Sequence, residues 1–235
     1  KISGRSYQWM HSETSVWAPA PECHADIELY LRGLSWEIRK SPRTLVFNLT
    51  LPFKRNKVDL LLEKKVTSIA YEQIQLADGS LPVMRPFSEI GGSMAAPIAA
   101  RFLQCNRGGK GILMGGVPGV PPAEAVILGS GVVATFATKS FLALGAHVTV
   151  IGIDLSGLQR LHDRFSGIVT MMSTERNIEK ATAYADVVVG AVMVTGQRSP
   201  VLVSRKMVQN MRPRSVIVDL SIDLGGCFET SRPTT

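Results

Sequence analysis

The sequence predicts an α/β protein with a doubly wound parallel sheet of the Rossmann type and a second, smaller and incomplete α/β domain. Three observations support this prediction. From residue 124 onward, short apolar runs alternate with segments of helical spacing. The apolar runs are nearly continuous, as expected for parallel strands covered on both faces. The first run ends at a glycine-rich turn, after which a helical segment leads to the next run.

The glycine-rich turn has the spacing of a phosphate-binding turn between a strand and a helix. Its first glycine permits a tight bend, and its second lets the main chain come close to a pyrophosphate. The following helix offers free N–H groups and the positive end of its dipole to that phosphate. Alanine replaces the third glycine of the usual fingerprint. The pattern tolerates alanine there, because that position only needs a residue small enough for the helix to pack closely on the strand. We therefore expect a bound dinucleotide, held by Gly129, Ser130, Gly131, Val132 and Val133.

The alternation of elements extends to the end of the chain. We expect strands at 125–128, 148–151, 168–172, 187–192 and 216–220, and helices at 132–144, 155–165, 177–184 and 204–210. Asp154 stands where it can cap the second of these helices.

The first half of the chain is less regular. Residues 105–123 are rich in glycine and proline, which indicates a loop near the meeting point of two domains. Before this loop, Glu89–Leu103 has helical spacing and many small residues, so we expect an interdomain or subunit-contact helix that Pro97 kinks or breaks. Residues 44–51, 58–62 and 68–71 then suggest strand, helix and strand, whereas residues 1–43 permit no assignment. The predicted domains are 1–86, a connection at 87–123, and a nucleotide-binding domain at 124–235.

Composition limits the classes of partner. The chain has 235 residues and a formal net charge of +7, but its basic residues are scattered and do not interleave with aromatic residues. We therefore expect no nucleic-acid partner. Three distant cysteines (Cys23, Cys105, Cys227) form neither a metal-ligand pattern nor a disulfide framework. With no apolar run of bilayer length and no visible secretory signal after Lys1, we expect a cytoplasmic protein without a membrane segment.

Three long motifs resemble one known family. They are VTSIAYEQIQLADGSLPVMRPFSEIGGSMA (66–95), GGKGILMGGVPGVPPAEAVILGSGVV (108–133) and SVIVDLSIDLGGCFETSRPTT (215–235). They are similar to alanine dehydrogenases, which are related to the nucleotide-binding subunit of the proton-translocating transhydrogenases. The resemblance covers residues 44–235. The stretch RPFSEIGGSMA favours the alanine dehydrogenase branch over the transhydrogenase branch.

The resemblance implies NAD-dependent, reversible oxidative deamination of L-alanine to pyruvate and ammonia, in a homo-oligomer that is a hexamer in the family. It implies that Asp223 is the carboxylate beside the nicotinamide ribose and the reacting centre, and its position after the last predicted strand suits a ligand site. It also implies that Ser88 touches the nicotinamide carboxamide and that the backbone around Val192 lines the cofactor cleft. The alternatives are a turn residue for Asp223, a helix cap for Ser88 and a core strand for Val192.

The sequence also departs from the family. Thr50 stands where the family has a catalytic histidine, and threonine does not titrate near neutral pH. Gly152 ends the second predicted strand, where an acidic residue normally binds the adenosine ribose. Asp154 is either a ribose ligand or only a helix cap, and Arg160 is a remote candidate for a phosphate contact.

The family's carboxylate clamp cannot be located, so the expected substrate domain is incomplete. Two alternatives to the enzyme therefore remain. One is a catalytically degenerate dinucleotide-binding protein of the same family, and the other is a transhydrogenase-type NAD(H)-binding domain.

Overall fold

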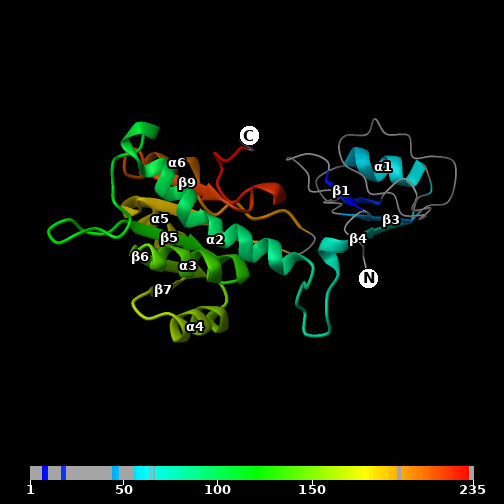
Figure 1. The fold of residues 1–235 in the computed structure, drawn as a ribbon, viewed down its shortest axis with the longest axis horizontal. Coiled ribbons are helices and arrows are strands. Elements are labelled where there is room, and N and C mark those ends of the chain that lie inside the picture. Colours follow the sequence, from blue (N-terminus) through cyan, green and yellow to red (C-terminus); the bar gives the residue numbers. More distant parts are fainter. Residues whose placement is uncertain are drawn as a thin grey trace. The chain divides into compact units, whose positions relative to one another are not determined.

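The computed structural model describes residues 7–9, 17–19, 44–47, 55–63, 65, 67–194 and 197–232. The chain divides into two compact units, residues 1–84 and residues 85–235. In Figure 1 the colours, from blue to red, follow the chain through both units.

The larger unit contains a parallel sheet, which has five strands in the part of the chain that the structure describes, in the order β7-β6-β5-β8-β9. These strands are β5 (Glu124–Leu128), β6 (His147–Gly152), β7 (Val169–Met172), β8 (Val187–Gly190) and β9 (Val216–Asp219). The chain adds β6 and β7 on one side of β5, then returns to add β8 and β9 on the other side. This reversal is a topological switch point, and ligands of open α/β sheets bind beside it, at the carboxyl ends of the strands.

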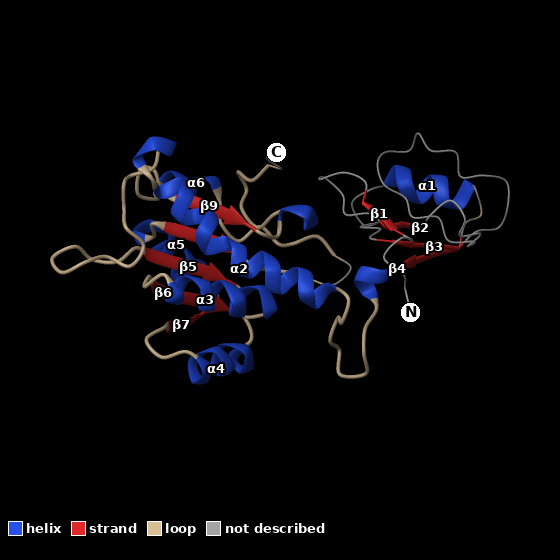
Figure 2. Ribbon diagram, in the orientation of Figure 1, coloured by secondary structure: helices blue, strands red, loops and turns tan. Residues whose placement is uncertain are grey.

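Helices cover both faces of this sheet, as the sequence predicts (Figure 2). The connecting helices are α3 (Val132–Ala143), α4 (Leu155–Arg164), α5 (Glu175–Tyr184) and α6 (Arg205–Gln209). Successive side chains of a strand point to opposite faces. In β5, Ala125 and Ile127 pack in the core with α2, α3 and α4, whereas Val126 and Leu128 pack in the core with α5 and α6. The doubly wound architecture and each strand and helix expected from residue 124 onward are confirmed, except that β8 ends at Gly190 and leaves Val192 in the loop after it, so the core-strand alternative for Val192 is wrong.

Helix α2 (Met84–Leu103) differs from its prediction, because it begins five residues earlier than Glu89 and continues through Pro97. Its small residues pack it closely against α3, since a Cβ on Gly92 would lie 2.4 Å from the carbonyl oxygen of Val133. Pro97 has no N–H to donate to the carbonyl of Ser93, four residues earlier. The hydroxyl of Ser140, on α3, donates to that carbonyl at 2.8 Å instead. The neighbouring helix thus replaces the hydrogen bond that proline removes.

The glycine- and proline-rich stretch at 105–123 forms turns and loops, apart from a short 3-10 helix at Cys105–Arg107. An ion pair attaches it to the sheet, because the ammonium group of Lys110 contacts the carboxylate of Asp186 just before β8. Asp186 is buried and also accepts a hydrogen bond of 2.9 Å from the amide of Glu124. These contacts lie at the amino ends of the strands, away from the switch-point edge.

The smaller unit contains two pairs of strands within its described residues. Strands β1 (Tyr7–Trp9) and β2 (Trp17–Pro19) are antiparallel, and β3 (Thr44–Phe47) and β4 (Thr67–Ala70) are parallel. Helix α1 (Arg55–Glu63) lies between β3 and β4 in the chain, which confirms the expected strand, helix and strand. Thr50 lies outside the described residues. None of the described helices in either unit combines the length and apolar character needed to cross a bilayer.

Candidate functional site

The turn after β5 is a tight bend that requires glycine at its first position. Gly129 has φ +122°, a conformation that residues with a Cβ rarely adopt. Its amide donates to the carbonyl of Ile151 at 2.7 Å, and the amide of Ala191 donates to Leu128 at 2.8 Å. A Cβ on Gly129 would lie only 2.2 Å from the carbonyl oxygen of Ala191. The bend is therefore fixed between the ends of β6 and β8.

Gly131 has no such structural reason to be glycine. Its φ of −87° and ψ of −161° are extended and open to any residue. A Cβ built on it would meet no atom within 4 Å. The space above the turn is thus open, and glycine at this position leaves room for a ligand.

Helix α3 begins at this open space without a side-chain cap. Asp154, Thr174 and Ser204 cap α4, α5 and α6 with side-chain oxygens, whereas the residue at the start of α3 is Gly131. Within the described part of the chain, the amides of residues 130–134 donate no hydrogen bond. Uncapped amides at the positive end of a helix dipole form a binding site for an anion. The geometry therefore fits the phosphate groups of the expected dinucleotide.

The side chain of Ser130 turns toward the end of β6. A Cβ on Gly152 would lie 2.9 Å from Ser130 Oγ, and a Cβ on Gly157, in α4, would lie 2.7 Å from the same atom. Ser130 thus fills the corner between β6 and α4. Both neighbouring glycines are needed to accommodate it.

Asp154 is the N-cap of α4, which was one of its two expected roles. Its carboxylate accepts hydrogen bonds from the amides of Ser156 and Gly157 at 3.1 and 2.9 Å. Ser156 Oγ donates to it at 2.8 Å, and Arg160 Nη2 lies 3.5 Å away. The hydrogen bond from the Ser156 side chain, with those from the two amides, lowers the pKa of Asp154 below its ordinary value. Its contact with a ribose remains a prediction.

The loops after β8 and β9 are joined through the hydroxyl of Ser221. This hydroxyl donates to the carbonyl of Val192 at 2.7 Å and accepts from the amide of Val192 at 3.0 Å. Ser199 Oγ donates to the same carbonyl at 3.1 Å. Both serines are buried, so the backbone of Val192 is held firmly at the carboxyl edge of the sheet.

Beyond Ser221 the chain makes a short 3-10 turn that presents Asp223 to solvent. Asp223 is exposed and has no hydrogen bond or ion pair with the residues that the structure describes. By contrast, the carboxylate of Asp219 accepts from the amides of Ser221 and Cys227 and is occupied within the fold. Asp223 is therefore the carboxylate of this loop that is available to a ligand.

Ser88 lies inside α2, so the expectation that it caps a helix is wrong. The helix begins at Met84, and Pro86 is tolerated in its first turn, where backbone N–H groups lack helical partners. Ser88 precedes Gly92 by one turn, and Gly92 packs against the first turn of α3. Its contact with a cofactor remains a prediction.

The structure thus brings most of the expected residues to one edge of the sheet. Contacts run continuously from Gly152 through Ser130, Gly129 and Ala191 to Val192 and Ser221. The sequence did not single out Ser199 and Ser221. A polar residue directly after a buried strand was the available signal for Ser221, but its partner became evident only from the pairing of β8 with β9.

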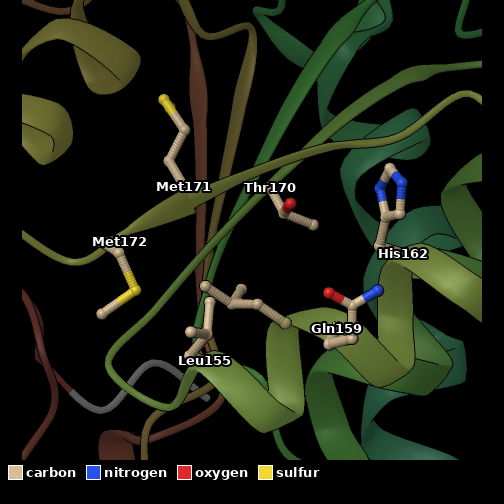
Figure 3. A pocket seen from close by; sticks show the side chains of 7 residues that line it. Leu155, Gln159, His162, Thr170, Met171 and Met172 are labelled. Atoms are coloured by element: carbon tan, nitrogen blue, oxygen red, sulfur yellow. The ribbon is translucent and has the colours of Figure 1, made fainter.

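Outside the glycine turn, the unit contains a histidine–carboxylate pair and a hollow. His147 pairs with Glu124 at the amino ends of the strands, with 3.3 Å between Nδ1 and Oε1. A hollow of about 250 Å³ lies between α4 and the edge strand β7, with His162 at its side (Figure 3). No cluster of metal-ligating side chains occurs among the described residues.

Comparison with known proteins agrees with this geometry. The family model described as "Alanine dehydrogenase/PNT, C-terminal domain" matches residues 95–235, more than half of the chain. The chain belongs to this family. The predicted resemblance is confirmed.

Curated relatives of the family match well but are much longer. An alanine dehydrogenase of Methanococcus maripaludis is 46% identical over 196 residues, which are 83% of this chain and 52% of the relative. An alanine dehydrogenase of Mycobacterium tuberculosis is 47% identical over 188 residues, 80% of this chain and 51% of the relative. The chain therefore spans about half the length of these relatives.

Two solved structures show the same fold. An L-alanine dehydrogenase superposes with a TM-score of 0.76 at 43% identity, over 83% of this chain and 55% of that protein. A transhydrogenase from Sinorhizobium meliloti superposes with a TM-score of 0.71 at 21% identity, over 88% of this chain and 62% of that protein. At that identity the second likeness concerns the fold alone.

A second family model, described as "Restriction endonuclease BsobI", matches residues 1–84. This is about a third of the chain. The match to the alanine dehydrogenase of Methanococcus maripaludis covers 196 residues, which is more than the stretch 85–235 contains. That match therefore extends into residues 1–84 as well. The edge of the sheet described above lies wholly outside this match.

Proposed function

We propose that the larger unit is the nucleotide-binding part of an alanine dehydrogenase and that it binds NAD. The observation that carries the proposal is the open, uncapped amino end of α3 behind the Gly129–Gly131 turn. A dinucleotide places its pyrophosphate at such amides, and the switch point of the sheet provides the crevice for its two ends. The family match over residues 95–235 supports NAD as this dinucleotide.

Residues on the two sides of the turn bind different parts of the dinucleotide. The amides of residues 130–134 hold the pyrophosphate, and the end of β6 lies beside the adenosine ribose. The backbone of Val192, fixed by Ser221, lines the opposite side of the cleft, where Asp223 and Ser88 meet the nicotinamide end. When bound, the nicotinamide supplies the hydride acceptor for oxidation of an amino acid.

The proposed reaction is the reversible oxidative deamination of L-alanine to pyruvate and ammonia. Relatives named alanine dehydrogenase, at 46–47% identity, support this substrate. Asp223 is the proposed catalytic residue, because its carboxylate is exposed and unpaired in the described structure, beside a buried and hydrogen-bonded loop. Thr50, which stands in place of the family histidine, leaves the proton transfer to water or to another group.

Absorbance of the reduced nicotinamide tests the reaction. L-alanine and NAD are added to the chain, and the same assay is run with Asp223→Asn. We expect turnover by the unchanged chain and at least about a tenfold loss in the variant, with NADH binding preserved in both. Equal turnover by the two proteins would exclude Asp223 from the reaction.

The replacement of the family histidine by Thr50 supports a second candidate function. In this alternative, the chain is a dinucleotide-binding protein of the family without catalytic activity. Binding of NADH without turnover of L-alanine would favour it over the enzyme. The transhydrogenase-type domain has weaker support, because its solved relative is only 21% identical.

We also propose a cytoplasmic homo-oligomer, a hexamer in line with the family resemblance. Helix α2 supports the oligomer, because Phe87, Ile90 and Met94 expose 50%, 62% and 47% of their surface on it. Sedimentation velocity measures the oligomer directly, and a species of monomer mass at micromolar concentration would contradict it.

A further inference from the structure

The end of β6 has no side chain that could recognise a ribose, and a side chain placed there would require Ser130 and Leu158 to shift. A Cβ on Gly152 would lie 2.9 Å from Ser130 Oγ, 3.0 Å from Ser130 Cβ and 3.2 Å from Leu158 Cδ2. In dinucleotide-binding folds, an acidic residue near this point binds the 2′-hydroxyl of the adenosine ribose. Its carboxylate also repels a phosphate on that hydroxyl. Glycine at position 152 thus omits this carboxylate, and the close packing of Ser130 against Gly152 disfavours a larger residue there.

Asp154, two residues later, does not replace that carboxylate. Both of its oxygens are engaged by the first turn of α4, through the amides of Ser156 and Gly157 and the hydroxyl of Ser156. A carboxylate with two amide donors and a hydroxyl donor is oriented toward its own helix. Its charge is also partly offset by the guanidinium of Arg160, 3.5 Å away.

Arg160 brings a positive charge to the same corner. Its Nη1 donates to Ser156 Oγ at 3.0 Å, and 69% of its side chain is exposed. Its guanidinium therefore lies over the first turn of α4, next to the end of β6, and keeps donors free for another acceptor. An arginine near this point accommodates a 2′-phosphate in dinucleotide-binding folds.

We propose that this site accepts dinucleotides with and without a phosphate on the adenosine 2′-hydroxyl, and that the Ser130–Gly152 pair determines this tolerance. The inference rests on the proposed function, since it concerns the adenosine end of the same site. It changes the class of cofactor from NAD alone to NAD and its 2′-phosphorylated form. Arg160 is the residue that meets the added phosphate.

Equilibrium binding of NADH and NADPH, followed by nicotinamide fluorescence at one fixed ionic strength, tests this inference. We expect the two dissociation constants to lie within about tenfold of each other. A preference for NADH greater than this would overturn the inference and leave the proposed function intact. If neither nucleotide binds, the proposed dinucleotide site fails as well.

Variants identify the residues responsible. The double variant Ser130→Ala/Gly152→Asp places a carboxylate at the end of β6. The Ser130→Ala change removes Ser130 Oγ, the atom that would lie nearest to a Cβ on residue 152. We expect the double variant to weaken NADPH relative to NADH by about tenfold or more, because like charges then face each other. Comparison with Ser130→Ala alone cancels any effect common to both nucleotides. An unchanged ratio would overturn the role of the pair.

Arg160→Gln tests the proposed phosphate contact. We expect it to weaken NADPH by about three- to tenfold, with a much smaller effect on NADH. Arg164→Gln is the matched control, because Arg164 is one turn further along α4 and stacks over the ring of Phe165. Arg160 would have no role in phosphate binding if Arg160→Gln weakened NADH and NADPH equally. The same conclusion would follow if Arg160→Gln and Arg164→Gln weakened NADPH equally.

Discussion

Gly129 packs directly against Ala191, so that a Cβ on the glycine would lie 2.2 Å from the carbonyl oxygen of the alanine. This contact joins the turn after β5 to the loop after β8. Two residues later, a Cβ on Gly131 would meet nothing within 4 Å. The two glycines of one turn therefore have separable roles, the first in folding and the second in binding.

Replacement of Gly129 by alanine should lower the free energy of unfolding. The new Cβ meets the backbone of Ala191, and φ of +122° is strained for any residue other than glycine. Such strain costs about 1–3 kcal/mol, and the clash adds to it. Urea denaturation measures the loss. A variant as stable as the unchanged chain would show that the bend is not held as described.

Replacement of Gly131 by valine should cost little stability but abolish binding of the dinucleotide. Its backbone is extended and the space is open, so we expect a loss of no more than about 1 kcal/mol, because valine is a poorer N-cap than glycine. The side chain would then occupy the path of the pyrophosphate. Calorimetric titration with NADH measures the effect. An unchanged dissociation constant would contradict the role of this glycine.

Replacement of Ser221 by alanine should lower both stability and affinity. The variant leaves the amide of Val192 without its partner, and an unsatisfied buried polar group costs about 1–3 kcal/mol. Ser215→Ala is the control, because its hydroxyl also donates to backbone carbonyls, but at the amino end of β9. We expect both variants to lose stability and only Ser221→Ala to weaken NADH binding. Equal affinities would show that the Val192 loop does not line the cleft.

The charge of Asp154 should stabilise the fold in a pH-dependent manner. Hydrogen bonds from Ser156 and Gly157 lower its pKa from 3.8, so its contribution is complete above pH 4 and is lost as the pH falls through the lowered value. Asparagine also caps helices but carries no charge. The difference in melting temperature between the unchanged chain and Asp154→Asn should therefore be larger at pH 7 than below pH 3.8, and should shrink as the pH falls through the lowered pKa. A difference that does not vary with pH would contradict this cap.

Cys227 should be protected from thiol reagents in the folded chain. Burial, together with the nearby Asp219 carboxylate, raises the pKa of its thiol far above the ordinary value, so the thiolate is not populated at neutral pH. Cys105 is exposed. We expect iodoacetamide to label Cys105 at pH 8 and Cys227 only after denaturation, as read by mass spectrometry. Equal labelling of both in the folded chain would place Cys227 at the surface.

The same raised pKa predicts how stability depends on alkaline pH. The unfolded chain releases the thiol proton of Cys227 at a lower pH than the folded chain, so stability should fall as the pH rises above about 9. Cys227→Ala should reduce this fall. A slope that the substitution leaves unchanged would assign the fall to other groups.

The sequence was sufficient to predict the sheet of the larger unit, because each strand is an apolar run with few alternatives. It was insufficient for α2. The continuity of this helix through Pro97 depends on a hydrogen bond from Ser140 to the carbonyl of Ser93, and these two residues are 47 positions apart. It also left the role of Asp154 open, since capping and ribose binding demand the same residue type at the same place. The three-residue strands β1 and β2 are too short to show any periodicity.

The glycine turn illustrates the same limit. Its spacing predicted the phosphate site, but it could not distinguish the glycine needed by the fold from the glycine needed by the ligand. That distinction requires the position of Ala191, which is 62 residues beyond Gly129 in the chain. Likewise, the pairing of Ser130 with Gly152 depends on how β5 and β6 align.

Mapping of backbone amide shifts by NMR during titration with NADH tests the central claim most directly. We predict that the amide resonances of residues 130–134 shift most strongly, because these amides donate to the pyrophosphate, and that the amide of Gly157, capped by Asp154, shifts less. Resonances of residues 130–134 that stay in place while NADH binds would show that the phosphates lie elsewhere.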